Sequence, residues 1–95
     1  MAKKMLRNKE DVEKFLNTYR SWPVWVDVPQ LGMVVYRYTF KSGHAIVATI
    51  AGGYPAPQFQ FLEPGGVYRP DRILYPLQIG FRMSLLWPVE VDMPD

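Results

Sequence analysis

The feature that most constrains this chain is a pair of apolar segments that flank a short turn sequence. Met33 to Phe40 (MVVYRYTF) and Ala45 to Ile50 (AIVATI) are rich in the β-branched and aromatic residues that favour strands. Ser42 and Gly43 lie between them, and glycine supplies the positive φ that a tight two-residue turn requires. The sequence therefore predicts an antiparallel hairpin with its turn at Ser42-Gly43.

This turn would fix the pairing of the two strands, with Phe40 facing Ala45 and Tyr36 facing Thr49. One hairpin face then carries the aromatic side chains, and the other is apolar as well. Antiparallel strands commonly keep one polar face toward solvent. We therefore expect the second face to bind a partner, with Arg37 outward because burial of an unpaired guanidinium is costly. The residues of this predicted partner-binding face are Val35, Arg37, Ile46, Ala48 and Ile50.

The segment before the hairpin predicts one helix over residues 8–20. Its apolar side chains recur at the spacing of a single helix face, at Val12, Phe15, Leu16 and Tyr19. Asn8 stands at the N-cap position, and Pro23 disfavours a helical backbone at the residue before it. Residues 1–7 are expected to form a basic tail.

The rest of the chain predicts short strands and turns. Gln58 to Leu62 (QFQFL) and Leu77 to Met83 (LQIGFRM) both alternate in the manner of strands. A chain of 95 residues is sufficient for one domain. The predicted fold class is α+β: an N-terminal helix packed on a largely antiparallel, meander-like sheet of about four to six short strands over residues 24–91. Residues 92–95 would form an acidic tail.

Composition argues against several kinds of site. The chain has no cysteine, which excludes disulfides, thiolate nucleophiles and cysteine-bound metals. His44 is its only histidine and follows the predicted turn, where an exposed side chain is expected. None of Ser21, Ser42 and Ser84 has an evident general base beside it. We therefore expect no enzyme, no metal and no cofactor.

The location of the protein is predicted from its apolar runs. No run approaches the about 20 residues that a membrane-spanning helix needs. The first residues, MAKKMLRNKEDVEKF, lack the apolar centre of a signal peptide. Together with the absence of cysteine, these features predict a cytoplasmic protein that does not bind membranes.

Two classes of function remain open. The first is a small non-enzymatic protein-binding module (accessory, inhibitory or regulatory) that uses the apolar hairpin face toward a second copy, as a homodimer, or toward another protein. The alternative is a single-stranded nucleic-acid-binding or metal-free ribonuclease-type protein that uses Tyr68, Arg69 and Arg72. A net charge of only +2, and Asp71 between the arginines, make nucleic acid the less favoured partner.

Overall fold

The computed structural model describes residues 2–28, 32–53, 56–69 and 72–94. Met1, Asp71 and Asp95, on which sequence-based expectations also bear, lie outside the described residues. The elements are β1 (Ala2–Leu6), α1 (Lys9–Leu16), η1 (Tyr19–Ser21), β2 (Val24–Val28), β3 (Met33–Thr39), β4 (Ala45–Ala51), β5 (Gln58–Leu62), α2 (Pro76–Met83), η3 (Ser84–Leu86) and β6 (Val89–Met93).

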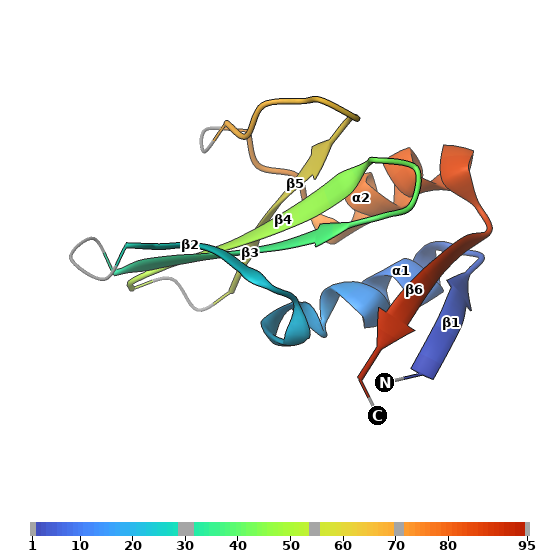
Figure 1. The fold of residues 1–95 in the computed structure, drawn as a ribbon, viewed down its shortest axis with the longest axis horizontal. Coiled ribbons are helices and arrows are strands. Elements are labelled where there is room, and N and C mark those ends of the chain that lie inside the picture. Colours follow the sequence, from blue (N-terminus) through green and yellow to red (C-terminus); the bar gives the residue numbers. More distant parts are fainter. Residues whose placement is uncertain (1, 29–31, 54–55, 70–71, 95) are drawn as a thin grey trace.

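The predicted α+β class is confirmed. Strands β2, β3, β4 and β5 form a four-stranded antiparallel meander in that order, and β1 pairs with β6 in a separate two-stranded sheet. Helices α1 and α2 and the β1–β6 ribbon lie on one side of the four-stranded sheet, and the chain that follows β5 rises on the other side (Figure 1).

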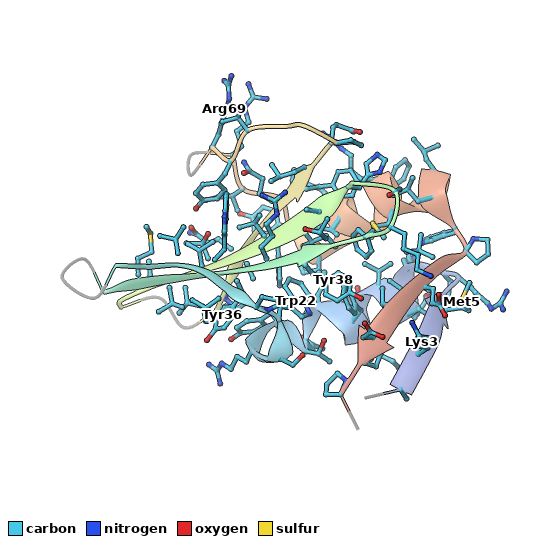
Figure 2. The ribbon with its side chains drawn as sticks, viewed as in Figure 1. Lys3, Met5, Trp22, Tyr36, Tyr38 and Arg69 are labelled. Carbon is cyan, nitrogen blue, oxygen red and sulfur yellow. The ribbon has the colours of Figure 1, made fainter. Side chains whose placement is uncertain are left out.

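Helix α1 confirms the prediction of an N-terminal helix. The Asn8 side chain caps it by accepting a hydrogen bond from the Asp11 N–H at 2.8 Å. Val12, Phe15 and Leu16 are buried against the sheet, as their spacing predicts. The side chains of Trp22, Tyr36 and Tyr38 lie between the sheet and this helix layer (Figure 2).

The register of the central hairpin differs from the predicted one by one residue. Tyr38 pairs with Ile46 and Tyr36 pairs with Ala48. The Phe40 N–H donates to the His44 carbonyl at 2.8 Å, and the Gly43 N–H donates to the Phe40 carbonyl at 3.0 Å, so the loop has three residues rather than two. Gly43 has φ +94°. This is the hairpin loop in which a left-handed glycine forms a bulge, and the two-residue prediction was wrong for that reason.

Each face of the four-stranded sheet covers its own apolar cluster. The main core joins the β1–β6 ribbon and both helices to one sheet face and contains Leu6, Val12, Phe15, Leu16, Trp22, Phe40, Ile46, Ala48, Phe59, Phe61, Ile79, Met83 and Val91. A smaller second core on the other face contains Val35, Ala45, Val47 and Leu62. Tyr68, from the chain after β5, packs against the second core and partly closes it.

The N-terminal segment is a strand rather than the predicted tail. β1 pairs with β6 from Ala2↔Met93 to Leu6↔Val89, and Leu6 is fully buried in the main core. Residues 92–93, expected in an acidic tail, belong to β6 for the same reason. A local pattern could not reveal this pairing, because the two strands lie at opposite ends of the described chain.

The segment Leu77 to Met83 is helical rather than extended. Pro76 occupies the first helical position, where its fixed φ suits a helix and its missing N–H costs nothing. The Gln78 side chain accepts a hydrogen bond from the Tyr75 N–H at 2.8 Å and so caps the same end. The apolar alternation that predicted a strand also fits a helix, because Ile79 and Met83 are four residues apart and are buried together in the main core.

Two polar contacts fasten the β1–β6 ribbon to the hairpin. The Asp92 N–H donates to the Tyr38 hydroxyl at 2.9 Å, and Lys41 Nζ lies 3.0 Å from Glu90 Oε2. Burial raises the pKa of the Tyr38 hydroxyl above its usual value, against the smaller opposing effect of the Asp92 hydrogen bond. The hydrogen bond from Lys41 lowers the pKa of the Glu90 carboxyl.

Replacement of Phe15 by Ala is expected to lower the free energy of unfolding by about 3–5 kcal/mol. The Phe15 ring is fully buried, lies 5.1 Å from the Trp22 ring and meets Tyr38 edge-on at 4.9 Å. Urea denaturation measures the change, with the exposed Lys14→Ala as the matched control on the same helix. A loss below about 1 kcal/mol would contradict the placement of Phe15 in the core.

Replacement of Lys41 by Met is expected to raise the pKa of the Glu90 carboxyl, because Lys41 is the main cause of its lowering. Since this pKa is depressed in the folded protein, the pair stabilises the fold above the unfolded-state pKa and loses its effect as the pH falls through the folded-state value. An NMR titration of the Glu90 carboxyl carbon reports the shift. Lys3→Met, which removes a smaller contribution, should move the pKa less.

Candidate functional site

The structure divides the residues of the predicted partner-binding face between the two sides of the sheet. Ile46 and Ala48 are fully buried in the main core, whereas Val35 is fully buried in the second core. Ile50 pairs with Val34 near the end of the hairpin and is half-buried. The five residues therefore do not form one surface, because the register shift separates the β3 members from the β4 members.

Arg37 has its partners within the chain. Its guanidinium carbon lies 4.8 Å from the centre of the Trp25 ring, and its Nε donates to the Thr39 hydroxyl at 3.3 Å. Trp25 is the additional residue of a bulge in β2, between Val24 and Val26. The Trp25 ring also meets Tyr68 edge-on at 5.5 Å. These contacts cover part of the second sheet face with the chain's own residues.

A buried glutamine anchors the backbone that carries the two arginines of the nucleic-acid alternative. The Gln60 Nε2 donates to the carbonyls of Arg69 and Arg72 at 2.6 and 3.1 Å, and its Oε1 accepts from the Arg69 N–H at 2.9 Å. The Tyr68 hydroxyl is 2.9 Å from the Thr49 hydroxyl, on the sheet. The Arg69 side chain instead points away from the sheet (Figure 2).

The space among these residues is too small for a base to enter. The hollow lined by Thr49, Gln60, Tyr68, Arg69 and Arg72 has a volume of about 10 Å³, roughly that of one water-sized probe. Arg69 and Arg72 are exposed around it. Among the described residues, this hollow is therefore too small to act as a stacking cleft for the nucleic-acid alternative.

The two most exposed large apolar side chains of the described residues, Phe81 and Leu85, lie on α2 and η3. Leu77, Phe81 and Leu85 are 59%, 80% and 89% exposed, and they follow one another at intervals of four residues on one helix face. Tyr75 and Ile73, 72% and 43% exposed, continue the apolar surface ahead of the helix. We call these five residues the α2 surface.

Two hollows adjoin the α2 surface. One, of about 430 Å³, runs along the helix between Leu77, Phe81 and Leu85, with Arg82 at its side. The other, of about 440 Å³, is lined by Ile73, Tyr75 and neighbouring apolar residues. Leu74 lines both, and no carboxylate of the described residues lines either. The surface is thus an apolar, ridged face with a single basic side chain beside it.

The sequence contained a signal for this surface that the strand interpretation obscured. Alternating apolar residues from Leu77 to Met83 also form two sets with a spacing of four residues. One set packs inward and the other, with Phe81 at its centre, points outward. A proline at the first helical position followed by this double spacing favours a helix with an exposed apolar stripe.

His44 is not the exposed turn residue that its position predicts. Its side chain is 17% exposed, and its ring stacks on Phe61 with centres 5.5 Å apart. His44 Nε2 lies 3.0 Å from Glu63 Oε2, and His44 Nδ1 lies 2.8 Å from the Ser42 hydroxyl. The expectation that Ser42 has no base beside it was therefore wrong as well.

Within the part of the chain that the structure describes, no three His, Asp or Glu side chains are grouped to hold a metal ion. No helix of these residues is long and apolar enough to cross a membrane. Comparisons with protein-family models, with curated proteins and with solved structures found no match to this chain.

Replacement of Gln60 by Leu is expected to destabilise the fold by about 1–3 kcal/mol, because it leaves the buried polar groups of the chain after β5 without partners. Urea denaturation measures the loss, and faster exchange of the Arg69 amide hydrogen locates it. Gln58→Leu, two residues away on the same strand, is the control and should change stability by about 0.5 kcal/mol or less. Equal effects of the two variants would contradict the role of Gln60.

Proposed function

We propose that this protein is a small protein-binding module that acts through the α2 surface, and that a second copy of the chain is the partner this surface fits. The observation that carries the proposal is the exposure of Leu77, Phe81 and Leu85 on one helix face. Protein binding is also the function that the sequence favours, but the binding surface proposed here lies on α2 rather than on the hairpin. The absence of cysteine supports placing this module in the reducing cytoplasm.

The area of the α2 surface supports a protein as the partner. Its five side chains, of roughly 200 Å² each and about two-thirds exposed on average, present on the order of 700 Å² of mostly apolar surface. The largest apolar patch of a typical monomer is about 300–600 Å². A standard protein interface buries about 800 Å² on each partner. The α2 surface therefore supplies most of one side of such an interface.

The shape of the surface supports a second copy. A two-fold dimer requires a patch that is complementary to itself. Phe81 projects from α2 and Leu85 from η3, and the hollow of about 430 Å³ opens beside them. In an antiparallel pair of α2 helices, the Phe81 ring of each copy would enter the hollow of the other. Binding of this kind needs no catalytic group.

Sedimentation equilibrium tests the proposal. We expect a reversible dimer with a dissociation constant in the micromolar range, about 1–100 µM, which corresponds to roughly −8 to −5.5 kcal/mol. Replacement of Phe81 by Asp should abolish the dimer, because it would place a carboxylate at the centre of an apolar interface. The thermal stability of the monomer should change little, since Phe81 is exposed.

The matched control is Val67→Asp, which introduces the same charge at an apolar residue that is also exposed but lies outside the α2 surface. It should dimerise as the unsubstituted protein does. A protein that stays monomeric at about 200 µM would overturn the proposal that a second copy is the partner. So would equal weakening by Phe81→Asp and Val67→Asp.

A further inference from the structure

We propose that Ser42, His44 and Glu63 form a nucleophile, base and carboxylate relay that hydrolyses carboxylic esters with a small apolar acyl group. The proposal uses no residue of the α2 surface and does not depend on dimer formation. It starts from two distances: 2.8 Å between Ser42 Oγ and His44 Nδ1, and 3.0 Å between His44 Nε2 and Glu63 Oε2. Nucleophile–base and base–orienting-group contacts of this length are the geometric requirement for an activated serine.

The directions of these hydrogen bonds agree with such a relay. An ionised carboxylate only accepts, so the imidazole hydrogen lies on Nε2, toward Glu63. Nδ1 then carries the free electron pair and accepts the hydrogen of the Ser42 hydroxyl. The His44 backbone N–H approaches Ser42 Oγ at 3.4 Å from another side. The ring is turned relative to the triad of serine proteases, where Nε2 faces the serine and Nδ1 faces the carboxylate.

The fold positions all three side chains. The bulged loop at Gly43 places Ser42 and His44 on either side of a left-handed residue, and stacking on Phe61 fixes the imidazole plane. Glu63 begins a turn in which the Gly66 N–H donates to the Glu63 carbonyl at 2.8 Å. Pro64 of this turn packs against the hairpin loop: a methyl group at Gly43 would lie 3.2 Å from it. The two turns are thus held against each other.

An apolar hollow beside Ser42 suits the acyl group. It has a volume of about 290 Å³ and is lined by Met5, Phe40, Leu86 and Val89 in addition to Ser42. Lys41 and Glu90 line the polar side of the same hollow, and Lys41 gives one hydrogen bond to Glu90. An ammonium group has three hydrogens, so Lys41 keeps two for a developing oxyanion.

In the first step, Ser42 Oγ attacks the carbonyl carbon of the ester, and the hydroxyl proton moves to His44 Nδ1. Glu63 stabilises the resulting imidazolium. The bond between the carbonyl carbon and the alkoxy oxygen then breaks, and the leaving alcohol takes the proton from Nδ1. In the second step, a water molecule gives a proton to Nδ1 and attacks the carbonyl carbon of the acyl-serine. The bond between this carbon and Ser42 Oγ then breaks, Oγ takes the proton back from Nδ1, and the acid is released. The sum is ester plus water to acid plus alcohol.

Hydrolysis of p-nitrophenyl acetate and p-nitrophenyl butyrate by the full chain tests the proposal. We expect turnover above the buffer rate, and Ser42→Ala or His44→Ala should lower kcat/KM by about 100-fold or more, the usual contribution of a general base. Glu63→Gln should lower kcat more than it changes KM.

The matched control is Ser84→Ala, an exposed serine whose hydroxyl donates to the Phe81 carbonyl at 2.6 Å. It should leave turnover unchanged. Thermal melting of each variant shows whether it is folded, and mass spectrometry after treatment with a fluorophosphonate probe should place the adduct on Ser42. The proposal is overturned if folded Ser42→Ala retains the full rate, if the phosphonyl adduct is found on His44 rather than on Ser42, or if the unsubstituted protein gives neither turnover nor an adduct.

Discussion

The left-handed backbone of Gly43 sets the register of the central hairpin, and the rest of the structure depends on that register. With φ +94° at Gly43, Phe40 faces His44, and Tyr38 and Ile46 fall on the same side of the sheet. This side continues onto β5 through Phe59 and Phe61, and it is the side that both helices cover. A slip of one residue would move polar and charged side chains of β3 or β4 into that core. The loop therefore determines which side chains of β3 and β4 face the main core.

The two faces of the sheet are closed by different means. Helices and the β1–β6 ribbon cover the first face through large apolar contacts centred on Phe15. The second face has no helix of the described residues over it. It is covered by Tyr68, by the Trp25–Arg37 contact and by the segment that the Gln60 side chain holds through hydrogen bonds to the backbone of Arg69 and Arg72. Helix α2 contributes only Ile79 and Met83 to the core under the first face. Its opposite side, with Leu77 and Phe81, can therefore remain exposed while both faces of the sheet are covered.

The sequence predicts those parts of the fold that local patterns specify. The cap at Asn8, the stripe of α1, the existence of the hairpin and the alternation of β5 all depend on neighbouring residues, and they were predicted. The pairing of β1 with β6 depends on distant segments and was missed. Ser42-Gly43 suits a two-residue or a three-residue loop, so the sequence pattern did not distinguish between the two registers. The α2 surface was hidden because its spacing of four residues also satisfies alternation, and the contact of His44 with Glu63 forms only when two turns meet.

The pairing of Ala2 with Met93 has a mechanical consequence. Because β1 and β6 are antiparallel and this pair is the outermost of the ribbon, tension applied across Ala2 and Met93 acts on one pair of residues at a time. The hydrogen bonds of the ribbon would then open in succession, as in a zipper, rather than share the load as they do when strands are pulled past each other in shear. The β1–β6 ribbon joins the two ends of the described chain. Under tension applied at those ends, the ribbon would therefore open before the four-stranded sheet does.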